Sequence, residues 1–221
     1  MTVYKQGGNT LCNVIGRENM SIITVSREFG SGGRELAKRL ADAMGFQYYD
    51  KEIVTEIANR THLHPEYVSE MLEKNTTFPI TYATSFVYMV VQDNVTQILS
   101  EQSNIIREIA KNGNCVIVGR AADILLADYK PFNIFVHAST QAKLDRCMAH
   151  QHDESETEKS VLRKMKTIDK NRKKYRALIS DNAWGDANNY HLCIDTTGLE
   201  IKQIVPVVAE YAKNWFGQQK K

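Results

Sequence analysis

The sequence predicts an α/β fold in which a five-stranded parallel sheet is covered by helices on both faces. Three observations predict it. Five short apolar, β-branched runs recur along the chain, and helical patterns fill the gaps between them. None of the five runs alternates cleanly between apolar and polar residues, which is typical of strands that are buried on both faces. The first run leads at once into a glycine-rich turn and a helix.

The strands are expected, in chain order, at Ile22–Ser26, Phe46–Asp50, Cys115–Gly119, Phe132–His137 and His191–Asp195. Helices are expected where apolar residues recur every three or four positions, at Arg34–Met44, Asn94–Lys111 and about Ile201–Trp215. Pro206 fits the last of these helices only in the first turn, because proline removes a backbone donor.

The spacing of the strands is uneven and predicts two insertions into one domain, residues 20–216. Strands two and three are separated by the 64 residues from Lys51 to Asn114, so we expect an inserted helical lobe at about residues 51–112. A second excursion lies between Ser139 and Tyr190 and places a second inserted region at about residues 150–185. Residues 1–19 are polar and contain glycine, so they are either a flexible extension or the result of a misplaced start at Met1.

Composition excludes several classes of protein. The chain has 221 residues, 28 Lys and Arg against 26 Asp and Glu, a net charge of +2, and 43% hydrophobic residues. These values exclude intrinsic disorder, a collagen-like fibre and a disulfide-stapled miniprotein. No run of 18 apolar residues occurs, so no membrane span is expected. The small net charge argues against a general nucleic-acid binder.

Four cysteines occur without any C-x-x-C pair, at Cys12, Cys115, Cys147 and Cys193. This spacing fits no common zinc module, and it predicts reduced thiols in a cytoplasmic protein. Two of them, Cys115 and Cys193, lie inside apolar runs and are expected to be small core residues.

The glycine-rich turn after the first strand is the strongest candidate site. It reads Ser26-Arg-Glu-Phe-Gly-Ser-Gly-Gly-Arg-Glu-Leu36, and a helix is expected to start within it. Backbone N–H groups in such a loop, together with the helix dipole, favour an anion. The alternative is a tight strand-to-helix turn that needs glycine only for its geometry. The loop lacks the lysine of a Walker P-loop, but its arginines favour phosphate; the candidate phosphate ligands are Arg27, Gly30, Ser31, Gly32, Gly33 and Arg34.

Several segments resemble the cytidylate kinase-like family, and they occur in the family's order. They are the run ITVSREFGSGGRELAKRLADAMGFQYYDKE, Cys115–Arg120, Phe132–Thr140, Asp169-x-x-Arg172 and Cys193–Leu199. The resemblance covers about residues 20–216. It implies a P-loop three-layer sandwich, a monophosphate-binding lobe inserted after strand two, and a lid after strand four. It also implies ATP and Mg²⁺ as cofactors and CMP or dCMP as the acceptor.

Position by position, the resemblance is partial. It places Gly33 where the ordinary kinases of the family have the P-loop lysine, and it matches Asp50 to the acidic residue that ends strand two. Arg120 belongs to a Gly-Arg pair that the resemblance places at the acceptor. The aspartate that would follow this pair and read the base is Ala121 here, and Asp123 is the candidate substitute. The resemblance leaves the Mg²⁺ ligands open.

Two arginines can replace the charge of the missing lysine. Arg34 follows the loop directly and Arg27 lies at its entry. Both are always protonated and able to bind a phosphate through two hydrogen bonds. Arg34 is placed among the catalytic residues. At the other side of the site we expect Arg120 to bind the acceptor monophosphate, with Asp50 and Asp123 beside it.

A basic segment at residues 161–176 carries eight Lys and Arg against Asp169, which is 8 − 1 = +7 in a chain of net charge +2. Arg172 and Arg176 lie one helical turn apart and are predicted to bind the same polyphosphate as a lid. The same charges are also compatible with a solvated helix face or with a nucleic-acid surface. The order of the segments favours the lid.

The favoured function is transfer of the γ-phosphate of ATP to CMP, dCMP or a similar small acceptor. One alternative is a nucleotide-binding sensor or pseudokinase that lost turnover with the lysine. A nucleic-acid-binding module that uses residues 161–176 is a weaker alternative. Nucleotides are therefore the expected partners.

Overall fold

A computed structural model describes residues 20–74, 85–150 and 156–219. It contains five strands, β1 (Ile22–Arg27), β2 (Gln47–Tyr49), β3 (Cys115–Val118), β4 (Phe132–His137) and β5 (Leu192–Asp195). The helices are α1 (Gly33–Met44), α2 (Glu52–Thr61), α3 (Pro65–Lys74), α4 (Ser85–Lys111), α5 (Ala122–Leu125), α6 (Thr140–Ala149), α7 (Glu158–Ile179) and α8 (Ile201–Gln219). Two short 3₁₀ turns are η2 (Ala127–Tyr129) and η3 (Ala187–Asn189). The strands therefore lie where the apolar runs predict them, with ends shifted by a residue or two.

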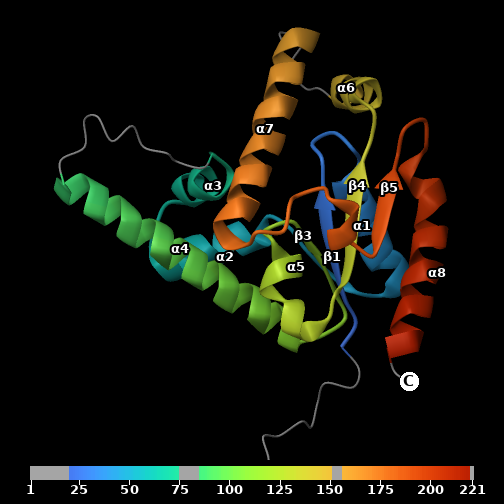
Figure 1. The fold of residues 1–221 in the computed structure, drawn as a ribbon, viewed down its shortest axis with the longest axis horizontal. Coiled ribbons are helices and arrows are strands. Elements are labelled where there is room, and N and C mark those ends of the chain that lie inside the picture. Colours follow the sequence, from blue (N-terminus) through green and yellow to red (C-terminus); the bar gives the residue numbers. More distant parts are fainter. Residues whose placement is uncertain (1–19, 75–84, 151–155, 220–221) are drawn as a thin grey trace, which may run out of the picture.

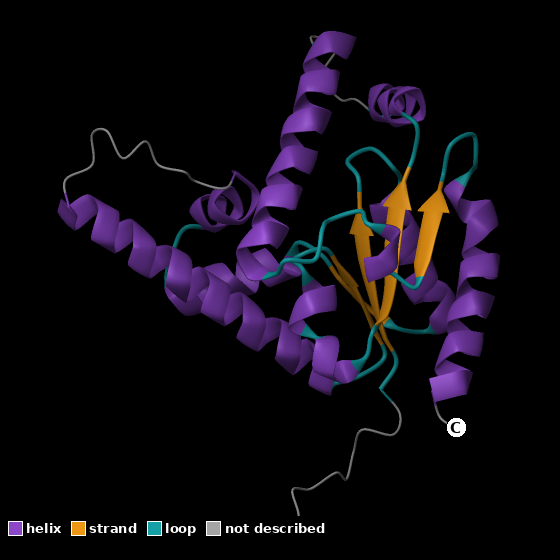
Figure 2. Cartoon of the chain, viewed as in Figure 1, coloured by secondary structure: helices purple, strands orange, loops and turns teal. Residues whose placement is uncertain are grey.

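The five strands form one parallel sheet in the order β2-β3-β1-β4-β5. Helices cover both of its faces, so the predicted three-layer α/β sandwich is confirmed (Figures 1 and 2). Ile23 and Val25 of β1 pack toward α1 and α8, whereas Ile22 packs with α2, α4 and α5. Because successive side chains of a strand point to opposite faces, a strand between two helix layers carries apolar residues on both faces.

The parallel register brings the carboxyl ends of the strands to one edge of the sheet. Val25 of β1 lies beside Val118 of β3 and Ile134 of β4. The segments that follow these strands therefore meet above the same edge, which is where ligands of open α/β sheets bind. The glycine-rich loop leaves β1 at this edge.

The two long excursions are helical. Between β2 and β3 lie α2, α3 and α4, and between β4 and β5 lie α6 and α7. Helix α7 stands above the carboxyl edge of the sheet and packs against α3 and α6 (Figure 1). The predicted extension, residues 1–19, lies outside the described residues, as does Cys12.

The C-terminal part of the chain differs from the prediction in two places. Cys193 is exposed and is not a core residue, because β5 is an edge strand of the sheet and one of its faces is open. Its residues alternate between half-buried and exposed positions. Pro206 lies in the second turn of α8, beyond the first-turn position expected for it. The helix nevertheless continues past it to Gln219.

Candidate functional site

The glycine-rich loop is held from outside by hydrogen bonds to its carbonyl groups. Arg146 of α6 donates from Nη1 to the carbonyl oxygen of Gly30 at 2.7 Å. The Thr196 hydroxyl donates to that of Ser31, also at 2.7 Å. Gly30 and Gly32 both have φ of 79°, a left-handed backbone that favours glycine. Helix α1 starts directly at Gly33, and its first N–H groups have no acceptor within the helix. The loop thus has the glycine backbone and the free helix N–H groups that favour an anion.

Helix α7 is docked onto this loop through one aspartate and one arginine. Asp169 accepts a hydrogen bond from the backbone N–H of Phe29 at 2.8 Å. Arg172 donates from Nη1 to the carbonyl oxygen of Arg27 at 2.9 Å and pairs with Asp169 at 3.0 Å. Burial raises the pKa of the Asp169 carboxyl, and the Phe29 N–H and Arg172 oppose that rise. Of the basic residues in α7, Arg172 is therefore in direct contact with the loop.

Four arginines and one buried aspartate gather at the end of the loop. Nε of Arg34 lies 2.5 Å from Oδ2 of Asp50, and Nη2 of Arg27 lies 3.9 Å from Oδ1 of the same carboxylate. Burial lowers the pKa of Arg27 to about 9, and the charges of Arg172, Arg120 and Arg34 act in the same direction. Asp50 alone opposes them. Such a concentration of positive charge favours an anionic ligand.

Two hollows flank the arginines. The first, which we call the loop hollow, has a volume of about 930 Å³ and lies along the glycine-rich loop, α1 and α6. The second, the basic hollow, has a volume of about 400 Å³ and lies between β3, α3 and α7. Its described lining includes six cations and no acidic residue: Arg27, Arg34, Lys51, Arg120, Arg172 and Arg176. The two hollows share Arg27, Phe29, Arg34 and Arg172.

The backbone is left-handed at three successive residues where β3 ends beside the basic hollow. Gly119, Arg120 and Ala121 have φ of 71°, 57° and 49°. This conformation costs about 1–3 kcal/mol at each residue other than glycine. Gln102 of α4 donates from Nε2 to the Arg120 carbonyl oxygen at 3.1 Å and so supports the turn. Strain of this kind clusters at functional sites, and it supports the expectation that Arg120 serves the site.

The cytidylate kinase-like family profile matches residues 22–198 of the chain. The chain belongs to the cytidylate kinase-like family. An uncharacterized protein from Eubacterium ventriosum ATCC 27560 has a similar structure, with a TM-score of 0.64, 28% sequence identity, and coverage of 87% of this chain and 98% of that one. Shikimate kinase from Bacteroides thetaiotaomicron shares the fold, with a TM-score of 0.53, 15% identity, and coverage of 88% and 99%. No curated protein matches the sequence.

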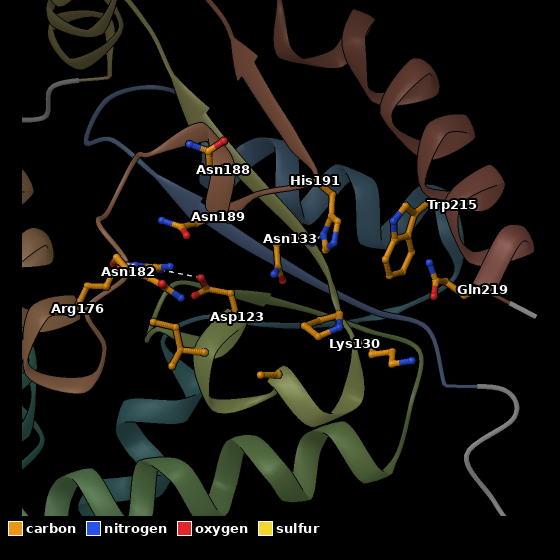
Figure 3. Close-up of a pocket in the computed structure, with 13 residues that line it drawn as sticks. Asp123, Lys130, Asn133, Arg176, Asn182, Asn188, Asn189, His191, Trp215 and Gln219 are labelled. Carbon is orange, nitrogen blue, oxygen red and sulfur yellow. Dashed lines mark hydrogen bonds and ion pairs between the residues drawn. The ribbon is translucent and has the colours of Figure 1, made fainter.

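The structure pairs two of the predicted site residues with each other. Asp123 and Arg176 form an ion pair at 2.6 Å between Oδ2 and Nη1, with both side chains buried (Figure 3). Arg176 also donates to the Asn182 carbonyl oxygen at 2.8 Å. Arg172 and Arg176 both line the basic hollow, but Arg172 contacts the loop whereas Arg176 is paired with Asp123. The carboxylate of Asp123, the candidate base reader, is engaged in the same pair.

A third hollow, of about 610 Å³, lies on the other side of this ion pair (Figure 3). Amide side chains and His191 line much of it, and Asp123 and Arg176 form one wall. No sequence motif pointed to it. It is separate from the glycine-rich loop, which does not contribute to its lining.

Sequence reasoning missed the residues that hold the loop from behind. Arg146 and Thr196 support its carbonyl groups, and Lys143 pairs with Glu28 of the loop at 2.7 Å. Thr196 directly follows β5, so the rule that parallel strands end at one edge would have pointed to it. Arg146 and Lys143 lie on α6, and their role depends on how that helix packs.

The described residues contain no group of three or more His, Cys, Asp or Glu side chains that could hold a metal ion. Mg²⁺ in nucleotide sites usually needs less, because it keeps several waters and binds one or two carboxylates together with substrate phosphates. Asp50 is the carboxylate at the arginines, and both of its oxygens are paired there, with Arg34 and Arg27. Among the helices described, none has the length and apolar character needed to cross a membrane.

Proposed function

We propose that this chain is a phosphotransferase that moves the γ-phosphate of ATP to CMP, dCMP or a similar small phosphorylated acceptor. One observation supports this most directly: the loop hollow and the basic hollow meet at Arg27, Arg34 and Arg172. A phosphoryl group that passes from a donor in one hollow to an acceptor in the other would cross this junction. Phosphoryl transfer depends mainly on positioning and on neutralising the charge of the moving group, and the junction supplies both.

In the proposed reaction an oxygen of the acceptor phosphate forms a bond to the γ-phosphorus of ATP. The bond from that phosphorus to the β–γ bridging oxygen breaks, and ADP leaves with the electron pair. The loop N–H groups, Gly30 to Gly33, would hold the donor phosphates, and Arg120 would hold the acceptor phosphate. Mg²⁺ that enters with the nucleotide would neutralise further charge on the donor phosphates.

The choice of cytosine as the acceptor base comes from the resemblance to the family. Asp123, the candidate base reader, is buried against Arg176. Cytosine is therefore supported by the family resemblance and not by a residue that we place at the base. The basic hollow itself favours an acceptor with a phosphate group, because its described lining holds five cations besides Arg176, which pairs with Asp123.

A nucleotide sensor without turnover is the second candidate, because the loop has Gly33 where ordinary kinases have a lysine. The experiment that separates the two compares binding with turnover. Thermal shifts are measured with ATP, CMP, dCMP, UMP and AMP, with and without Mg²⁺, since a ligand that binds only the folded state raises its apparent stability. ADP formation is then followed with each acceptor. A kinase forms ADP only when Mg²⁺ and its acceptor are both present; shifts without any ADP, across the whole panel, would favour the sensor.

A further inference from the structure

Position 33, where a Walker loop has its lysine, has no room for a side chain. A Cβ atom at Gly33 would lie 2.5 Å from Cβ of Arg27 and 3.2 Å from Cβ of Val136. The first of these distances is shorter than any real contact between such atoms. Gly33 starts α1 with an ordinary helical backbone, so its backbone conformation does not require glycine. The side chain of Arg27 excludes any larger residue there.

The same arginine also occupies the space of a second glycine. A Cβ atom at Gly119 would lie 1.9 Å from Nη1 of Arg27. The Arg27 side chain therefore extends from the end of β1, where its Cβ lies against Gly33, to the end of β3, where its guanidinium lies beside Gly119. Two glycines that are far apart in the sequence leave room for one side chain.

The surroundings of this guanidinium are unfavourable without an anion. The Arg27 side chain is 15% exposed, and the closest carboxylate in the described part of the chain, Asp50, is 3.9 Å away and also pairs with Arg34. The charges of Arg34, Arg120 and Arg172 all act on Arg27 in the same direction as its burial. A buried cation among other cations is costly unless a negative ligand compensates it. Arg27 lines both the loop hollow and the basic hollow.

We propose that Arg27 supplies, from the end of β1, the phosphate-neutralising charge that a Walker lysine supplies from the start of the helix. Gly33 and Gly119 are then glycines because this arginine needs their space. The guanidinium can bind two phosphate oxygens at once, and its place between the hollows suits the phosphoryl group in transfer. The inference rests on the proposed function and names the residue that makes a lysine-free loop work.

The sharpest test moves the charge back to position 33. Three variants are compared: Arg27→Gly, Gly33→Lys, and the double variant that combines them. Arg27→Gly should lower ATP-dependent turnover by about 100-fold or more, in line with the loss of one preorganised donor to a developing charge. In the double variant the absence of a side chain at position 27 makes room for the new lysine, and turnover should recover at least tenfold over Arg27→Gly. Gly33→Lys alone should lower the melting temperature, because the added Cβ meets that of Arg27.

Binding of inorganic tripolyphosphate, measured by calorimetry, gives a second readout that needs neither a base nor turnover. Arg27→Gly should weaken this binding about tenfold or more, and the double variant should regain most of it. The matched control is Arg39→Ala, which removes an arginine that pairs with Glu35 on the outer face of α1. It should leave both readouts within about twofold, since exposed pairs contribute little. Circular dichroism confirms that each variant is folded.

The possible outcomes separate the two proposals. Turnover or tripolyphosphate binding that survives Arg27→Gly within about threefold, or a double variant no better than Arg27→Gly, would overturn the role of Arg27 alone. Arg27-dependent tripolyphosphate binding in a protein that phosphorylates no acceptor would overturn the proposed function and leave this inference standing. A wild-type protein that binds neither ATP nor tripolyphosphate would overturn both.

Discussion

Arg176 and Asp123 form a buried ion pair, with Nη1 and Oδ2 2.6 Å apart and the side chains only 4% and 3% exposed. Arg176 also lies over the ring of Tyr190, 5.5 Å from its centroid. The pair joins the end of α7 to α5. It forms the wall between the basic hollow and the third hollow, which amide side chains line. The ion pair therefore holds the C-terminal end of α7 in place, whereas Arg172, one turn earlier, contacts the loop.

We expect Arg176→Ala to destabilise the protein by about 3–5 kcal/mol, because it leaves the Asp123 charge buried without its partner. Asp123→Ala should cost a similar amount, and the double variant should cost clearly less than the sum. Denaturant unfolding measures all three. The control is Glu108→Ala, which removes an exposed partner of Arg60 and should cost less than about 1 kcal/mol. An Arg176→Ala protein with wild-type stability and greatly reduced ATP affinity would restore the predicted lid role.

Gly119→Ala tests the space that Arg27 occupies. The new methyl group would meet Nη1 of Arg27 at 1.9 Å, and because the far end of a long side chain can move, the main effect should be displacement of the guanidinium. Gly45→Ala is the matched control: its φ of 69° is close to the 71° of Gly119, and nothing lies within 4 Å of its Cβ position.

Both alanine variants should lose a similar stability, about 1–2 kcal/mol, from the left-handed backbone. Only Gly119→Ala should also lose ATP affinity, by about tenfold, since that is the cost of one weakened charge-assisted contact. Calorimetric titration with ATP and Mg²⁺ measures the difference. Equal ATP affinities in the two variants would show that Arg27 tolerates the displacement or does not bind phosphate.

Much of the fold was predictable because the three central strands, β1, β3 and β4, are buried on both faces. Continuous apolar runs such as Cys115–Val118 identify such strands without further information. The burial of β5 was not predicted correctly. Cys193 lies in an apolar run and was expected in the core, but it is exposed because β5 lies at an edge of the sheet. The sequence does not show which strands form the edges. The loop was recognisable from its glycines and its place after β1.

The arrangement of the site was only partly predictable, because its decisive contacts join residues far apart in the sequence. Helical spacing correctly put Arg172 and Arg176 one turn apart. Arg176, however, pairs with Asp123, which is 53 residues away in the sequence. Likewise, the resemblance places Gly33 where ordinary kinases of the family have a lysine, but it does not say why. The structure shows that the Arg27 side chain fills the space beside Gly33, and the sequence does not reveal this contact.

Arg172→Ala separates a lid from a nucleic-acid surface. Arg172 binds the Arg27 carbonyl oxygen and Asp169, so its loss should release α7 from the loop and lower turnover about tenfold or more. Lys170→Ala is the control, because this exposed residue of α7 lines a separate hollow with Met165 and Lys173, and it should stay within about twofold. Oligonucleotide binding that falls steeply with salt and weakens equally in both variants would support the nucleic-acid surface instead.

The pH dependence of stability should report the burial of Cys115. Burial raises the pKa of this thiol to about 12, whereas an unfolded cysteine titrates near 8.5. Below about pH 8.5 both states keep the proton and the full stability is present. Above it, the unfolded chain releases a proton that the folded chain retains, so stability falls as pH rises toward 12.

Between pH 8 and pH 9.5 this thiol should remove about 1.3 kcal/mol of the free energy of unfolding, measured by urea unfolding under reducing conditions. Cys115→Ala lacks the thiol but keeps every other titrating group, so its loss over the same interval should be smaller by that amount. Identical pH slopes in the two proteins would mean that the thiol ionises freely in the folded state.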